Sequence, residues 1–127
     1  MAQGGAAVIR LIIAELSRAD DQRHDWYAWV TNQLAHGVVG MAAAAALLAS
    51  GMAPCAVPVW AALVYWTVWE CAWQGGRDPD DSLSDASHVA AGSLFAAALA
   101  AAGPAAAMVM LVPWGLLLAI GIIRRCA

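Results

Sequence analysis

The sequence predicts an all-α integral membrane protein, a four-helix bundle preceded by an N-terminal amphipathic surface helix. Of its 127 residues, 63% are hydrophobic and 12% are charged, whereas a soluble domain averages about 45–50% apolar and roughly 25% charged residues. The mean hydropathy is +0.68. Several apolar stretches also approach the roughly 20 residues that cross the hydrocarbon core of a bilayer. Together these observations exclude a water-soluble single domain.

The charge balance excludes a nucleic-acid binder, and the basic and cysteine residues limit which reactions the chain could catalyse. The net charge is −3, the isoelectric point is about 5.3, and no basic patch exists to neutralise phosphates. All six basic residues are arginines, which argues against lysine-based chemistry. The three cysteines, Cys55, Cys71 and Cys126, show no CxxC spacing, and we interpret them as inert membrane-embedded thiols rather than metal ligands or disulfide partners.

The first unit, residues 1–25, is predicted to be an amphipathic surface helix followed by a polar link. Over residues 6–18 the apolar side chains recur at helical spacing along one side: Ile9, Ile12, Ile13 and Leu16. This stretch is too short and too charged to span a bilayer, so we expect it to lie on the membrane surface. Packing on a partner protein is the alternative.

The second unit, residues 26–127, is predicted to be a transmembrane helical bundle with spans at about 29–52, 54–73, 83–102 and 105–123. The turns between the first and second spans and between the third and fourth carry no charge. With four spans every arginine lies on the opposite face, which the positive-inside rule makes cytoplasmic. We therefore expect an inner (cytoplasmic) membrane protein with both termini in the cytoplasm. A three-span arrangement would separate Arg124 and Arg125 from the other arginines.

Polar residues form stripes at helical spacing on three of these spans. The first stripe is Asp25, Trp29, Asn32, His36 and Gly40, the second is Trp66, Glu70 and Trp73 with Gln74 beside it, and the third is Asp81, Asp85, His88 and Gly92. In the four-span topology all three lie toward the cytoplasmic end. We expect a buried cluster of His36, Glu70, Asp85 and His88, with Asp25, Asn32, Gln74 and Asp81 forming a structural polar stripe.

A charged side chain at mid-bilayer costs roughly 2.5–3.5 kcal/mol, so the cluster is expected to face the bundle interior. Three interpretations of this cluster remain open. The cluster can hold the helices together through hydrogen bonds. A histidine and a carboxylate can act as an acid–base pair. The same four residues also offer ligand types that suit zinc, although no HxxxH or HExxH pair is present. The sequence identifies no catalytic residue and no cofactor.

The polar loop over residues 74–85 holds four aspartates around Arg77. Asp81 or Ser82 is expected to cap the helix that follows, since acidic residues complement the dipole at a helix N-terminus. Cation binding by Asp78, Asp80 and Asp81 is the alternative, although their spacing differs from an EF-hand.

Small residues recur at spacings of four along the spans, which allows close approach between helices. The pairs are Gly40 with Ala44, Gly92 with Ala96, and Gly115 with Ala119. They fit a tight bundle, a homo-oligomer or a membrane-protein partner. On the last span Met108, Met110 and Trp114 are expected to face lipid.

The first three spans carry three short motifs: Asn32-x-x-x-His36-x-x-x-Gly40, Glu70-x-x-x-Gln74-x-x-Arg77, and Asp85 with Gly92 seven residues later. In these motifs the chain resembles VanZ-like and YfiM-like small bacterial membrane proteins. Asn32-Gln33 stands where an Asp-Lys pair is common, and Val89 where VanZ-like proteins usually have Asn. The resemblance covers about residues 32–94. It implies a cell-envelope context and a site at His36, Glu70 and Asp85, and it implies no particular reaction.

These observations predict a small polytopic protein of a bacterial or phage inner membrane, with a structural or accessory role in a membrane assembly. A holin-like lysis protein is one alternative, and toxicity on expression would identify it. A cell-envelope enzyme acting on a lipid-linked substrate, with His36 or Glu70 as base, is the other. Membrane lipid and either a second copy or a membrane-protein partner are the expected partners, and nucleic acid is excluded.

Overall fold

The computed structural model describes residues 25–75 and 79–126, and every regular element within them is helical. The elements are α2 (Trp26–Ala49), α3 (Val57–Val64), the π-helix η1 (Tyr65–Trp73) that continues α3, α4 (Pro79–Ala102) and α5 (Pro104–Cys126). The all-α prediction is thereby confirmed for this part of the chain. The expected amphipathic helix over residues 6–18 lies outside the described residues, as do Arg77 and Asp78.

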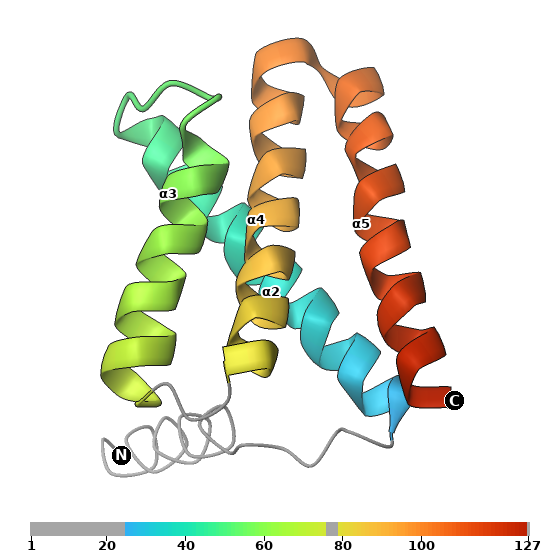
Figure 1. Cartoon of the computed structure of the whole chain (residues 1–127). Helices are drawn as coiled ribbons and strands as arrows, with labels where there is room; N and C mark the ends of the chain where they lie inside the picture. The colour runs from blue at the N-terminus through green and yellow to red at the C-terminus, as the bar shows by residue number, and fades with distance from the viewer. Residues whose placement is uncertain (1–24, 76–78, 127) are drawn as a thin grey trace, which may run out of the picture.

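The helices run alternately in opposite directions through the molecule (Figure 1). The turn that joins α2 to α3 and the turn at Gly103 lie at the top of the view. The starts of α2 and α4 and the ends of η1 and α5 lie at the bottom. Helix α4 packs against each of the other elements, with α3 and α5 on either side of it and α2 crossing behind.

Three helices, α2, α4 and α5, are long and apolar enough to cross a membrane. Helix α3 has eight residues and is too short alone, but the nine residues of η1 extend it along the same path. Large apolar side chains are exposed on the outer surface, among them Val38 at 59%, Met108 at 61% and Leu116 at 60% exposure. Such a surface is typical of a protein that faces lipid rather than water.

The helix boundaries follow from local capping and turn chemistry. Asp25 precedes α2, and its carboxylate accepts hydrogen bonds of 3.0 Å from the backbone N–H groups of Tyr27 and Ala28. The chain reverses at Gly103, whose φ of 82° favours glycine, and α5 begins at Pro104. This turn places α5 beside α4.

Helix α4 begins earlier than the sequence predicted. Asp81 or Ser82 was expected to cap the helix from in front of it, but α4 begins at Pro79 and both residues lie within it. Proline is favoured in the first turn of a helix because its missing N–H is not needed there. Asp80 and Asp81 are in the first turn, where acidic side chains stabilise the helix dipole.

Glycines bring the backbones of α2 and α4 into contact. A Cβ atom on Gly92 would overlap the backbone carbonyl of Gly37, and a Cβ atom on Gly40 would overlap the carbonyl of Val89. Only glycine permits such an approach, which explains why α2 can cross directly behind α4.

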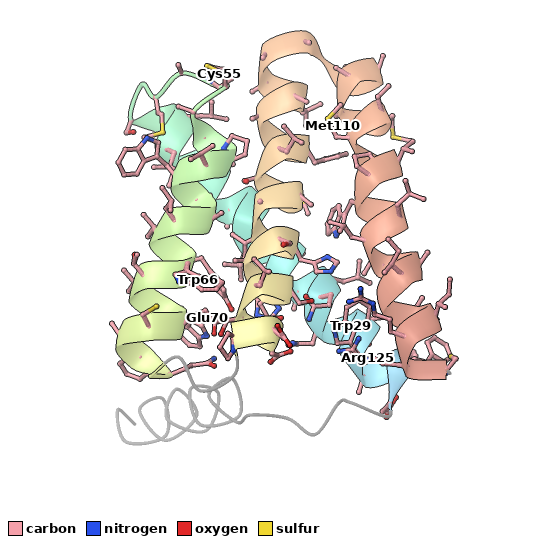
Figure 2. The ribbon with its side chains drawn as sticks, in the orientation of Figure 1. Trp29, Cys55, Trp66, Glu70, Met110 and Arg125 are labelled. Atoms are coloured by element: carbon pink, nitrogen blue, oxygen red, sulfur yellow. The ribbon has the colours of Figure 1, made fainter. Side chains whose placement is uncertain are left out.

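The interior differs between the two ends of the bundle. Near the two turns at the top of the view, Ala44, Val57 and Ala97 form an apolar core with partly buried neighbours such as Leu47 and Met52. At the opposite end, side-chain oxygen and nitrogen atoms gather between the helices (Figure 2). We call this second region the polar end, defined by the starts of α2 and α4 and the ends of η1 and α5.

Candidate functional site

Helix α4 carries three buried polar side chains at the polar end, Ser82, Asp85 and His88. They are spaced by three residues, and in a helix of 3.6 residues per turn each such step falls about 60° short of a full turn. The three side chains therefore point in successively different directions. Each of them bonds to a different neighbouring helix.

Asp85 connects α4 to α2. The Gln33 side-chain amide donates a hydrogen bond of 2.7 Å from Nε2 to Asp85 Oδ1. On the next turn of α2, His36 Nε2 lies 3.5 Å from Asp85 Oδ2, with side-chain exposures of 14% for the histidine and 7% for the aspartate. Both carboxylate oxygens thus have a partner on α2, which offsets the cost of taking this acid out of water.

Ser82 connects α4 to η1. The Ser82 hydroxyl donates a hydrogen bond of 2.5 Å to Glu70 Oε2, and Glu70 is 2% exposed. Figure 2 shows Glu70 directed from η1 toward the beginning of α4. The Tyr65 ring packs edge-to-face on the His36 ring with centroids 5.5 Å apart. Tyr65 belongs to η1, as Glu70 does, and His36 lies beside Asp85, so this ring contact links the two hydrogen-bonded groups.

The π-helix sets the direction of Glu70. The sequence pattern placed Trp66, Glu70 and Trp73 on one α-helical face, but Glu70 is buried while Trp73 is 60% exposed. The i→i+5 winding of η1 turns the chain less per residue than an α-helix. Trp73 stacks on Trp69 instead, with ring centroids 6.1 Å apart.

His88 connects α4 to α5. The Trp114 indole donates a hydrogen bond of 3.0 Å from Nε1 to His88 Nδ1. Trp114 was expected to face lipid, and this prediction is wrong, because its side chain is only 7% exposed. Gly37 leaves the space that the ring fills, since a Cβ there would overlap the Trp114 indole. Met108, in contrast, is exposed as expected.

Trp29 and Arg125 bring the start of α2 to the end of α5. The Arg125 guanidinium lies 4.2 Å from the centroid of the Trp29 ring, and the two side chains lie close together in Figure 2. Gly121 makes room for this ring, because a Cβ there would overlap it. The Trp29 ring also meets the His88 ring edge-on at 5.7 Å.

The structure brings some of the expected site residues together and separates others. His36 and Asp85 are in contact, while Glu70 and His88 bond to Ser82 and Trp114 instead of joining that pair. The four residues expected to form a structural stripe differ in exposure: Asp25 and Asp81 are exposed, and Asn32 and Gln74 are half-buried.

Sequence reasoning missed Gln33, Ser82 and Trp114. Gln33 is fully buried, whereas its neighbour Asn32 was placed on the polar stripe. One signal was available, because Gln33 lies four residues from both Trp29 and Gly37, in line with the buried face of α2. Ser82 was interpreted only as a cap, and nothing in the local pattern distinguished Trp114 from lipid-facing side chains.

Five buried side-chain atoms have no hydrogen-bond partner of standard geometry within residues 25–75 and 79–126. They are Trp29 Nε1, Gln33 Oε1, His36 Nδ1, the Tyr65 hydroxyl and Glu70 Oε1. Buried polar atoms in native proteins are nearly always satisfied, by protein, water or ligand. The polar end therefore has unused hydrogen-bonding capacity.

A metal centre has no counterpart in the described part of the chain. No three His, Cys, Asp or Glu side chains there come together in an arrangement that could hold a metal ion. The expected ligands His36, Glu70, Asp85 and His88 are instead distributed over the three hydrogen-bonded connections of α4.

Comparisons with protein-family models, with curated proteins and with solved structures found no match for this chain. The resemblance to VanZ-like and YfiM-like proteins therefore stays a prediction. The function has to be argued from the residues and their geometry.

Proposed function

We propose that the chain is a four-span protein of a bacterial or phage inner membrane, with both termini in the cytoplasm, that serves as a structural or accessory subunit of a membrane assembly. The distribution of charge supports this orientation. Arg124 and Arg125 lie at the polar end of α5, while the turns at the other end, over residues 50–56 and at Gly103, carry no charge. An excess of arginine marks the cytoplasmic side of short-loop membrane proteins.

The observation that carries the structural role is the way α4 holds the other helices. Ser82, Asp85 and His88 each bond to a side chain of a different helix of the same chain. Hydrogen bonds between helices in a membrane contribute about 0.6 kcal/mol on average and up to about 1.7 kcal/mol. Buried polar groups used in this way define how the helices assemble, which is what a scaffold for other subunits needs.

Helix α5 offers an outward face for such a partner. Gly115 and Ala119 are both exposed, and a Cβ atom on Gly115 would meet nothing within 4 Å. Small residues four apart permit close approach of another helix. Because none of the described residues covers the pair, a helix of another subunit is its expected occupant.

The test is purification in a mild detergent, followed by identification of co-purifying proteins and their stoichiometry by mass spectrometry. We expect a membrane-protein partner in a fixed ratio, lost from a Gly115→Leu variant. Ala42→Leu, a similar enlargement at an exposed position of α2, is the control and should retain the partner. A wild-type chain purified without any stoichiometric partner would contradict the accessory role.

A second function, an enzyme acting on a lipid-linked substrate, is favoured by the unpaired atoms at the polar end. His36 Nδ1, Glu70 Oε1 and the Tyr65 hydroxyl are buried without partners of standard geometry, as in sites that bind a polar group. The test is to incubate the purified protein with membrane lipid extract and follow lipid-linked species by mass spectrometry. Enzyme activity requires turnover that His36→Ala abolishes and Asn32→Ala preserves, with both variants folded. Equal turnover in both variants argues against this function.

A further inference from the structure

An open groove of about 570 Å³ lies between α4 and α5 at the polar end. It is separate from the Asp85 and Glu70 hydrogen bonds, which face α2 and η1. Trp29 and His88 line it, together with polar and apolar side chains of both helices. Both residues are 2% exposed, so they form its buried floor.

The floor supplies two hydrogen-bond donors, one from Trp29 and one from His88. Trp29 Nε1 is buried without a partner among residues 25–75 and 79–126. His88 Nδ1 accepts from Trp114, so a neutral His88 ring carries its proton on Nε2 and is a donor there. A buried donor without an acceptor carries a free-energy cost. An acceptor-rich group such as a phosphate would remove that cost at Trp29.

The rim of the groove carries charges of both signs. Asp80 and Asp81 belong to the first turn of α4, and Arg124 and Arg125 to the last turn of α5, and all four line the groove. Arginine suits phosphate, and a carboxylate suits an ammonium group. The Asp81 and Arg125 charges attract each other, while Asp80 and Arg124 supply one acid and one base. Such a rim favours a zwitterion over a purely anionic or cationic ligand.

The groove continues along an apolar surface. Leu83, Leu117 and Ile120 also line it, and they are 59%, 39% and 50% exposed. An amphiphile could therefore place its headgroup at the charged rim and its hydrocarbon along these side chains. The shape and chemistry together match one phospholipid molecule seated from the side of the bundle.

We propose that this groove binds a phospholipid with a phosphate–ammonium headgroup that can donate hydrogen bonds, of the phosphatidylethanolamine class. The phosphate lies against Trp29 and Arg124, the ammonium group against Asp80, and the acyl chains along α4 and α5. The site rests on the membrane location proposed above, because only there does the open side meet lipid. It does not depend on an accessory role.

The experiment is native mass spectrometry of the purified protein titrated with phosphatidylethanolamine, phosphatidylcholine or phosphatidylglycerol of identical acyl chains. We expect one phosphatidylethanolamine bound about tenfold more tightly than the others, equivalent to about one charge-assisted hydrogen bond. Phosphatidylcholine carries the same charges but has no ammonium N–H, so the comparison isolates the hydrogen bond between the ammonium group and Asp80. Soluble phosphoethanolamine tests whether the acyl chains are needed.

Two groove variants locate the site. Trp29→Phe keeps an aromatic ring and removes the indole N–H, so it should lower the affinity for all three lipids by a similar factor. Asp80→Asn should weaken the binding of phosphatidylethanolamine most, because that lipid loses a charge-assisted hydrogen bond as well as an opposite charge. Phosphatidylcholine loses only the opposite charge, so the preference between the two lipids should shrink. Trp60→Phe, at an exposed position of α3, is the matched control for the first change. If Trp29→Phe fails to fold, Arg124→Gln at an exposed residue tests the phosphate contact instead.

Three results would overturn the proposal. The first is equal binding of the three lipids, and the second is tighter binding of phosphatidylglycerol. The third is affinity for soluble phosphoethanolamine that equals affinity for the lipid. The accessory role is tested by co-purification with the Gly115→Leu variant, whereas lipid binding is tested with variants of the groove. Failure of one proposal can therefore be distinguished from failure of the other.

Discussion

The pairing of Gln33 with Asp85 is the residue-scale feature on which the polar end most depends. Gln33 is 0% exposed, and its donated bond to Asp85 is among the few side-chain connections between α2 and α4. Removing one member leaves a buried polar group without its partner, which is more costly than the bond is worth. Substitution of Gln33 should therefore lower the free energy of unfolding more than substitution of a neighbouring amide.

We expect Gln33→Ala to lower the free energy of unfolding by about 1–2 kcal/mol, within the range for hydrogen bonds between membrane helices and for a newly unpaired buried group. The adjacent Asn32→Ala, which removes a half-buried amide, should change it by less than about 0.5 kcal/mol. The measurement is reversible unfolding by SDS in mixed micelles. Equal losses in the two variants would show that the Gln33–Asp85 bond has no special weight.

Sequence reasoning located the polar end but misassigned particular residues within it. His36, Glu70, Asp85 and His88 were chosen because ionisable side chains within a bilayer are costly, and that argument does not depend on packing. The choice of Asn32 rather than Gln33 does depend on packing. Neighbouring residues on a helix point about 100° apart, and only the position of α4 decides which amide is buried.

At the scale of the helices, apolar length predicted which segments are helical, and local chemistry decided where each one ends. The span expected at 83–102 extends back to Pro79 because proline and two acids favour a helix start. The winding of η1 could not be predicted from spacing. A π-helix and an α-helix share the same residue types and hydropathy. They differ in which carbonyl each N–H reaches, and therefore in the number of residues per turn.

Two glycine substitutions should show whether a glycine matters because another helix touches it or merely because it is a glycine within a helix. Gly92→Ala puts a methyl group onto the Gly37 carbonyl, so we expect a loss of about 1–3 kcal/mol in the free energy of unfolding from overpacking between α2 and α4. In Gly115→Ala the added methyl group meets no described residue within 4 Å, so this variant should be neutral or slightly more stable. Unfolding in mixed micelles measures both, and a Gly92→Ala variant as stable as the wild type would contradict the close backbone approach.

At the scale of the whole molecule, the native cysteines offer a test of the four-span topology. Cys55 lies in the exposed turn before α3, and Cys126 is the last residue of α5. They are at opposite ends of the bundle, and Figure 2 shows Cys55 near the top. If both termini are cytoplasmic, Cys55 faces the periplasm.

We expect a membrane-impermeant maleimide to label Cys55 in intact spheroplasts, in a variant that retains only this cysteine. A variant that retains only Cys126 should be labelled after permeabilisation and not before. Each variant is the control for the other, because the reagent and the expression level are the same. The reverse pattern would place the polar end outside the cell, and labelling of both before permeabilisation would contradict a four-span topology.

The arrangement of the helices was less predictable than their existence. Hydropathy predicted the fold class, and the positions of the arginines predicted that the polar stripes share one end of the bundle. Both predictions depend only on how a bilayer accommodates apolar and charged segments. That α4 is the central helix, and that Trp114 turns inward to His88, follow from glycine contacts between segments far apart in the sequence. No periodicity within a single helix contains that information.

The short passage of α3 and η1 has a consequence for the lipid around the protein. Its eight and nine residues cover at most about 26 Å at 1.5 Å per residue, less than the roughly 30 Å hydrocarbon core. In the proposed four-span arrangement, this flank is in negative hydrophobic mismatch with the bilayer. A short span is accommodated by local thinning of the bilayer or by oligomerisation. The protein should therefore partition toward thinner membrane regions and group with proteins that deform the bilayer in the same way.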